Sequence, residues 1–200
     1  MHDEDVLDSV TDAAKQHTQI LAHCNGDRAC QQFIDAVRLA PQKPERPVMI
    51  HAQFLGIDQL DEVKQWQIIP SFFVAHVYHW GDVHIQNFGL SRAADISPAA
   101  EALQRGILFT FHQDAPVIEP DMLQTVWSAV CRQTKGGVLL GEKERIDVLS
   151  ALKAVTVHAA YQYFEENEKG SIRPGKVEDL IVLDQDPLKV PAEKLKDILV

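Results

Sequence analysis

Four short apolar runs in this chain each end on a histidine or an aspartate, and this pattern constrains the fold more than any other feature. The runs cover residues 19–23, 48–51, 68–76 and 107–114. Segments with the apolar spacing of helices separate them, and this alternation predicts a parallel sheet with right-handed crossovers. Because the carboxyl ends of parallel strands meet around one crevice, the polar residues that close the strands are expected to share a site.

The segments between and after the strands differ in character. Helices are expected over residues 5–17, 27–40, 58–66, 98–105, 122–134 and 148–164. Residues 76–97 are rich in aromatic and polar residues and are expected to form a long connection. Near the end of the chain, residues 170–176 are rich in turn formers. Residues 179–184 then form an isolated β-type run without a following long helix, which predicts a strand of a different, smaller sheet.

Composition excludes several classes of partner. The 200 residues are 46% hydrophobic and 24% charged, which is ordinary for a soluble globular protein. A net charge of −10 argues against nucleic acid as a partner, and no apolar run approaches the ~20 residues of a membrane span. The acidic start is unlike a secretory signal. Three scattered cysteines, Cys24, Cys30 and Cys131, are too few for a disulfide framework and predict a reducing, cytoplasmic location.

Two histidines and one aspartate carry the metal hypothesis. His23 and His51 lie about one strand–helix unit apart, so adjacent strands would bring their imidazoles, which are good zinc ligands, close together. Each histidine alone is more often a hydrogen-bonded core or loop residue, and for the pair both readings stay open. Asp114 could contact a metal and accept a proton from water, or it could cap the turn before Ala115-Pro116. His112 alternates with Asp114 and is not assigned as a ligand.

The densest polar and aromatic segment covers residues 75–84. Aromatic walls with a few polar groups are typical of small-molecule pockets, so substrate contact is the favoured role. The three histidines in this segment follow no recognised metal-ligand spacing, and a surface loop remains the alternative.

Taken together, these segments resemble the amidohydrolase superfamily, and specifically its family 3, the branch with deacylase- and deformylase-like members. The segments that carry the resemblance are residues 22–29, 50–53, 70–84, 111–117, 169–176 and 179–188. The resemblance implies an α/β fold, namely the C-terminal half of a TIM-like (β/α)8 metal-dependent hydrolase barrel and part of a small β-sandwich. Residues 1–168 would form the partial barrel with its strands five to eight, and residues 169–200 the partial sandwich segment.

The resemblance also implies roles for single residues. His23, His51 and Asp114 would bind a divalent metal, zinc, with one or two ions in a complete family member. Asp114 would also be the catalytic residue, which takes a proton from the attacking water and passes it to the leaving nitrogen of a carbon–nitrogen (non-peptide) bond. A small-molecule amide-type substrate would contact four residues of the segment after strand seven: His76, Tyr78, Trp80 and His84.

Two departures from the family pattern concern completeness. Such enzymes open with a His-x-His pair on strand one and carry a further ligand near strand four, whereas only His2 and His17 precede His23 here. We therefore expect a fragment, a truncated product or one half of a two-chain or homodimeric barrel, weak in zinc binding and inactive alone. Four strands would also leave two open sheet edges and four partly uncovered side chains: Ile20, Leu21, Ile50 and Phe73.

Three functions remain as hypotheses. The first is the C-terminal half of an amidohydrolase, active when a barrel-completing chain supplies strands one to four. The second is a non-catalytic remnant that acts as a binding or assembly module. The third, and least favoured, is a self-contained hydrolase that uses the histidines of residues 76–84 as its own metal site.

Overall fold

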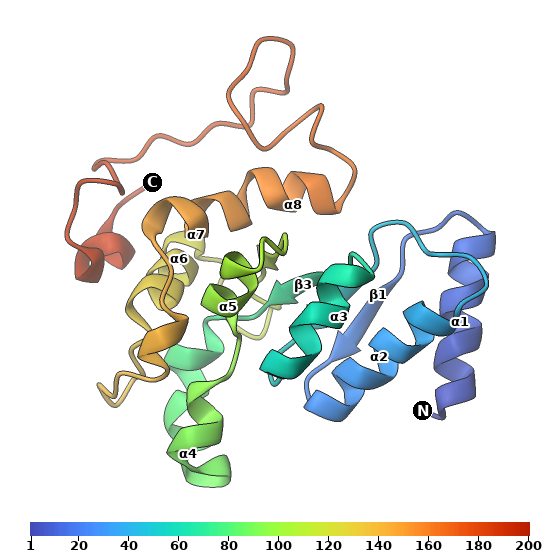
Figure 1. Ribbon diagram of the computed structural model, residues 1–200. Coiled ribbons are helices and arrows are strands. Elements are labelled where there is room, and N and C mark those ends of the chain that lie inside the picture. The colour runs from blue at the N-terminus through green and yellow to red at the C-terminus, as the bar shows by residue number, and fades with distance from the viewer.

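Four parallel strands form one sheet in the computed structural model, which describes residues 1–200. They are β1 (Leu21–Cys24), β2 (Val48–His51), β3 (Ile69–Phe72) and β4 (Thr110–Phe111), and they lie side by side in chain order. Every pairing is parallel, and helical segments connect each strand to the next (Figure 1). The α/β class and the four strand positions are therefore confirmed, although the strands are shorter than the apolar runs.

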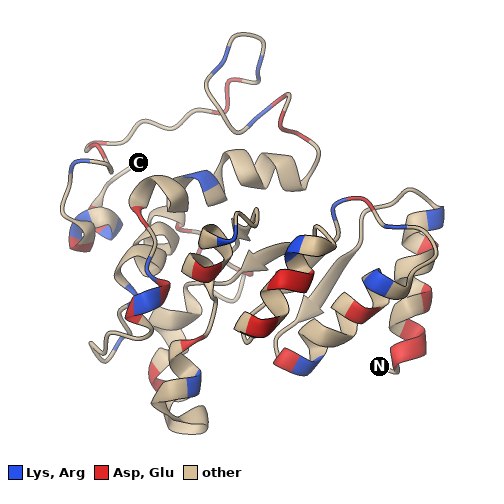
Figure 2. Ribbon diagram, viewed as in Figure 1, with Lys and Arg blue, Asp and Glu red and all other residues tan.

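Helices precede, connect and follow the strands of this sheet. Helix α1 (Asp3–Lys15) precedes it, and the connections contain α2 (Asp27–Leu39), α3 (Leu60–Gln65), α4 (His76–Ala94) and α5 (Ala99–Gln104). After β4 come α6 (Met122–Cys131), α7 (Val148–Val155) and α8 (Val157–Gln162). Short 3-10 helices are η1 (Ile57–Gln59), η2 (Glu142–Glu144) and η3 (Ala192–Asp197). Helix α1 packs on α2, and η3 packs on α6. Acidic residues are frequent along α1, as the red segments of its ribbon show (Figure 2).

Helix α2 illustrates why these segments fold against the sheet. Its buried residues Cys30, Phe33, Ile34 and Val37 recur with the helical period and belong to the main core cluster. Burial of each large apolar side chain contributes about 1.5–3 kcal/mol. Asp121 and Asp147 begin α6 and α7 by accepting hydrogen bonds from backbone N–H groups in the first turn, at 2.9 Å in both cases.

The segment expected to be a long connection, residues 76–97, is mostly helical, so that expectation was wrong. Helix α4 runs from His76 to Ala94 with a kink at Gly89, whose φ is +77°. Val77 and Gly81 are buried on one side of the helix. Its other sides carry aromatic and polar residues, so the apolar spacing that marks an amphipathic helix is missing from the sequence.

The expected helix over residues 148–164 is divided in two at Thr156. Three successive β-branched residues, Val155, Thr156 and Val157, lower the helical preference there. The Thr156 hydroxyl also donates to the carbonyl of Leu152 at 2.7 Å, a bond that tends to bend helices.

The strand expected over residues 179–184 is not formed, and no strand lies in residues 169–200. The backbone there has no neighbouring strand to pair with, and the side chains of Leu180, Ile181 and Val182 are exposed. A small β-sandwich is therefore not shown, and the division of the chain after residue 168 stays a prediction. Further along, Leu195 and Ile198 are buried in the main core.

The sheet ends on two unpaired edges, because β1 pairs only with β2 and β4 only with β3. Leu21 is 43% exposed on β1, and Ile20 and Ile50 are half-buried, as expected for an open sheet. Phe73 differs from the expectation because it is fully buried; the rings of His51, His76 and Trp80 lie around it. None of the helices combines the length and the apolar character that crossing a bilayer requires.

Candidate metal centre

His51 occupies the last position of β2 in an unusual backbone conformation. The register pairs it with Cys24 and Phe72, whose side chains belong to the helix-covered core. At the strand end, however, φ is +70° at His51 and +46° at Ala52, which interrupts the regular pleat. Left-handed backbone in such residues costs on the order of 1–3 kcal/mol and tends to occur at functional sites. The His51 side chain, 4% exposed, is thereby held at the carboxyl end of the sheet.

His112 follows β4 and joins two neighbouring strands. Its Nδ1 lies 3.0 Å from the Ser71 hydroxyl on β3, and its Nε2 lies 3.2 Å from Nδ1 of His51. A continuous chain of hydrogen bonds therefore runs from Ser71 through His112 to His51. Because Nδ1 of His51 is used in this chain, its Nε2 is the nitrogen left for a ligand.

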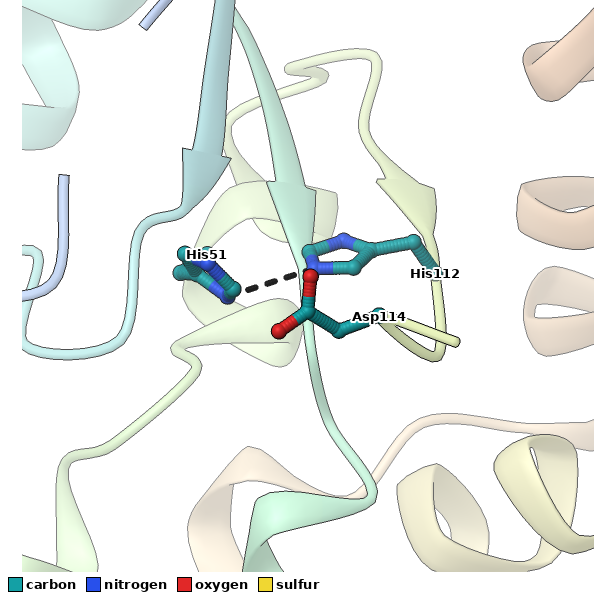
Figure 3. Close-up of side chains that lie close together, drawn as sticks. All are labelled: His51, His112 and Asp114. Atoms are coloured by element: carbon teal, nitrogen blue, oxygen red, sulfur yellow. Dashed lines mark hydrogen bonds between the residues drawn. The ribbon is translucent and has the colours of Figure 1, made fainter. Parts of the chain in front are cut away.

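Asp114 completes a group of three side chains at this end of the sheet. One potential ligand atom from each of His51, His112 and Asp114 lies within 4.8 Å of the other two. Figure 3 shows the hydrogen bond between the two imidazoles, whose planes are inclined by 61°, with the Asp114 carboxylate close to them. The Asp114 side chain is exposed and makes no hydrogen bond or ion pair, so nothing supports the turn-capping alternative.

Burial keeps both imidazoles neutral. Desolvation lowers the pKa of His51, and the adjacent His23 adds to this effect while Asp114 opposes it. Desolvation also lowers the pKa of His112, to about 4, with His51 as the next contribution. Neutral imidazole nitrogens and a free carboxylate are the donors that zinc and similar divalent ions bind, so these residues fit a metal site.

His23 lies next to this group without being one of its three members. Its ring centroid is 4.5 Å from that of His51, and its Nε2 lies 3.2 Å from the side-chain amide of Asn25. The side chain is exposed at the free edge of the sheet. Of the three expected ligands, the structure therefore brings His51 and Asp114 together and places His23 beside them.

His112 is the residue that sequence reasoning left out of the metal hypothesis. The available signal was its alternation with Asp114 in the sequence, which indicates that the two side chains share a direction. A contact with Ser71 one strand away requires the sheet register, which the sequence does not give.

The predicted substrate segment divides between two sides of α4. His76, Trp80 and His84 follow one another at four-residue spacing and share one side, and the ring centroid of His76 lies 4.7 Å from that of Trp80. Tyr78 lies on a different side and packs on Trp127, with ring centroids 5.3 Å apart. Because α4 is a helix rather than a loop, Tyr78 is turned away from the other three residues. No group of three metal-ligating side chains forms within residues 76–84.

A parallel α/β half-barrel with histidines and a carboxylate at the carboxyl ends of its strands defines the class of TIM-barrel metal-dependent hydrolases. Comparison with known sequences agrees. The sequence model described as "Amidohydrolase family" matches residues 1–200, and the chain belongs to this family.

Three relatives illustrate the similarity. The chain is 24% identical to an N-substituted formamide deformylase from Arthrobacter pascens over 98% of its own length and 37% of the relative. It is 30% identical to the protein LONG AFTER FAR-RED 3 from Arabidopsis thaliana over 90% of the chain and 32% of the relative. An uncharacterized metal-dependent hydrolase from Pyrococcus horikoshii OT3 has the same fold, with a TM-score of 0.82 and 24% identity over 96% of this chain and 39% of that chain. The chain thus spans about a third of the curated relatives it matches.

Proposed function

We propose that this chain supplies the carboxyl-terminal part of the active site of a metal-dependent hydrolase that cleaves non-peptide carbon–nitrogen bonds. The observation that carries the proposal is the convergence of His51, at the carboxyl end of β2, with His112 and Asp114, which follow β4 on the far side of β3. Family membership supports the same class of reaction.

The proposed metal is zinc, held by three side chains of this chain. His51 and Asp114 would hold the ion together with His23 from the neighbouring strand, and His112 would orient His51 through the hydrogen bond between them. When bound, zinc supplies Lewis acidity for a carbonyl oxygen and for the attacking water. His23 is exposed, and its ring centroid already lies 4.5 Å from that of His51.

Asp114 is proposed as the catalytic acid and base. Its carboxylate is unpaired and reaches solvent, so it can accept a proton from the attacking water. The same group then returns the proton to the leaving nitrogen, which makes that nitrogen a better leaving group. The backbone at Asp114 is left-handed, with φ of +54°, and its carboxylate lies beside the imidazoles.

The substrate is proposed to be a small amide that lies against the side of α4 formed by His76, Trp80 and His84. Aromatic and imidazole rings in this position provide an apolar wall with a few polar groups. The deformylase relative makes an N-substituted formamide a reasonable first probe.

The open edge of β1 supports the proposal that a further strand pairs there and continues the barrel. Exposed Leu21 and unpaired backbone groups on this strand could pair with a strand that continues the barrel, in the same longer protein, in a second copy or in another chain. The same edge is the observation that favours the second candidate function, a binding or assembly module without hydrolysis.

The compartment proposed is the reducing cytoplasm. Cys24, Cys30 and Cys131 are all free thiols, and the first two are buried. This arrangement agrees with a protein that does not depend on disulfides.

A chimera tests the catalytic proposal. The chain would replace the matching part of the A. pascens relative, and formate release from formanilide would be measured with zinc present. Asp114→Asn in the chimera should lower kcat about 10²–10⁴-fold, because the proton acceptor is lost while the size of the side chain is kept. Asp8→Asn, an exposed change on α1, serves as the matched control. Full activity of the Asp114→Asn chimera would contradict the proposal, and a folded chimera without hydrolysis would favour the binding module.

A further inference from the structure

We infer that His84 fixes the tautomer of His76, so that His76 presents its Nε2–H as a hydrogen-bond donor to the carbonyl oxygen of a bound amide. In this arrangement, Nε2–H of His84 donates to Nδ1 of His76. The part that concerns the substrate rests on the proposed function, whereas the tautomer does not.

The two imidazoles form a close pair on the site-facing side of α4. Nδ1 of His76 lies 3.2 Å from Nε2 of His84, and the rings are stacked with an interplanar angle of 19°. They stand two helical turns apart, which allows the rings to meet along one side of the helix. A hydrogen bond between two neutral imidazoles needs one donor and one acceptor, so only two tautomer arrangements are possible.

The surroundings of His84 select one of them. Its Nδ1 is buried and has no hydrogen-bond partner, while the rings of Phe54 and Phe88 lie 5.6 and 5.9 Å from the imidazole. If His84 accepted from His76, its own proton would sit on Nδ1 as a buried N–H without an acceptor. Buried donors of that kind are rarer than unsatisfied acceptors. The favoured arrangement therefore puts the His84 proton on Nε2, directed at Nδ1 of His76.

This choice determines what His76 offers to a ligand. Burial, helped by the neighbouring His84, lowers the pKa of His76 to about 3, so the ring is neutral and carries a single N–H. With Nδ1 accepting from His84, that N–H is on Nε2, which makes no hydrogen bond and is not sealed from solvent.

His76 and the candidate metal centre contact the same aromatic ring, that of Phe73. His76 packs on Phe73 with ring centroids 4.6 Å apart, and the same Phe73 ring lies 5.4 Å from His112 and 6.2 Å from His51. An amide carbonyl near the metal group would thus meet a neutral donor from α4. Such a bond strengthens as negative charge develops on the oxygen during attack, and removal of one such donor typically lowers kcat about 10²–10³-fold.

Nitrogen-15 NMR of the histidine side chains, performed on the 200-residue chain, tests the tautomer directly. His76 should show protonated Nε2 and unprotonated Nδ1, with its signals assigned by their loss in His76→Gln. His84→Gln retains an amide N–H that can donate to Nδ1 and should keep this tautomer. His84→Glu introduces a carboxylate that only accepts, so the His76 proton should move to Nδ1. Far-UV circular dichroism checks that each variant is folded.

Two NMR results would overturn the inference. One is a wild-type His76 protonated on Nδ1, and the other is an unchanged tautomer in folded His84→Glu. In the deformylase chimera, His84→Glu should lower kcat for formanilide about 10²–10³-fold relative to His84→Gln, because only the glutamine can still donate to His76. Equal activity of the two variants would also overturn it. A chimera with no hydrolysis at all would count against the proposed function, while the NMR result would still decide the tautomer.

Discussion

His112 is held at both ring nitrogens, by Ser71 on one side and by His51 on the other. An imidazole held in this way orients its neighbour, as carboxylates and carbonyls do beside many metal-bound histidines. His112 therefore positions His51 and is not itself one of the proposed metal ligands.

His112→Ala should weaken zinc binding by about 10–100-fold, because His51 loses the partner that orients it. Isothermal titration calorimetry with zinc measures the change. His17→Asn is the matched control, since His17 is exposed and its φ of +53° suits asparagine. An affinity unchanged by His112→Ala would show that the hydrogen bond between the two histidines has no part in the site.

At the scale of elements, one buried arginine joins α6 to the end of α4. Arg132 is fully buried, and its guanidinium donates to the carbonyls of Ile96, Ser97 and Leu140 at 2.9, 3.2 and 3.0 Å. Desolvation lowers the pKa of Arg132 to about 10, partly offset by Glu144, so the group stays charged at neutral pH. Glu144 in turn accepts from two backbone N–H groups at the start of α5.

Arg132→Met should destabilise the protein by about 3 kcal/mol or more, because each buried carbonyl left without a donor costs about 1–3 kcal/mol. Urea unfolding measures the loss. Arg38→Met removes an exposed arginine and should change the free energy of unfolding by less than about 0.5 kcal/mol. Equal stabilities of the two variants would mean that the guanidinium does not hold these elements together.

The elements that could be predicted from the sequence are those with one apolar and one polar side. Helix α2 follows this pattern and was predicted nearly to its ends, whereas α4 was missed because aromatic and polar residues occupy the side that faces the site. The same limit applies to the site. His51 and Asp114 could be predicted as strand-ending residues, but the partnership of His51 with His112 depends on sheet register and on the left-handed backbone at residues 51 and 52.

At the scale of the whole molecule, α8 and the turn after it close the end of the sheet opposite the metal centre. Arg46, just before β2, forms a bidentate ion pair with Glu166 at 3.0 and 2.7 Å. Its guanidinium also lies over the rings of Tyr161 and Phe164, 3.7 and 4.2 Å from their centroids. Nearby, the Gln19 side chain donates to the carbonyl of Gln162 at 2.7 Å. These contacts link segments more than a hundred residues apart.

The Arg46–Glu166 pair should make stability depend on pH in the acid range. The hydrogen bond from Arg46 lowers the pKa of Glu166 from 4.5 to about 2 in the folded protein. A lowered folded pKa means that the stabilising contribution is present above the unfolded pKa and is lost as the pH falls from about 4.5 to about 2. Glu166→Gln should therefore lower the free energy of unfolding at pH 6. Its free energy of unfolding should also fall less than that of the wild type as the pH drops from about 4.5 to about 2.

Urea unfolding at several pH values measures that difference. Glu165→Gln, which removes a more exposed pairing with Lys169, is the matched control. If the free energy of unfolding had the same pH dependence in wild type and Glu166→Gln, the acid sensitivity would not come from the Arg46–Glu166 pair.

The central claim is that His51 and Asp114 hold a divalent metal at the carboxyl end of the sheet. Anomalous diffraction at the zinc absorption edge, from crystals grown with zinc, tests it most directly. We expect an ion about 2.0–2.1 Å from an imidazole nitrogen of His51 and about 2.0–2.2 Å from a carboxylate oxygen of Asp114, and its loss in Asp114→Asn. Zinc bound only at acidic residues of α1, or between His76 and His84, with none at His51, would contradict the claim.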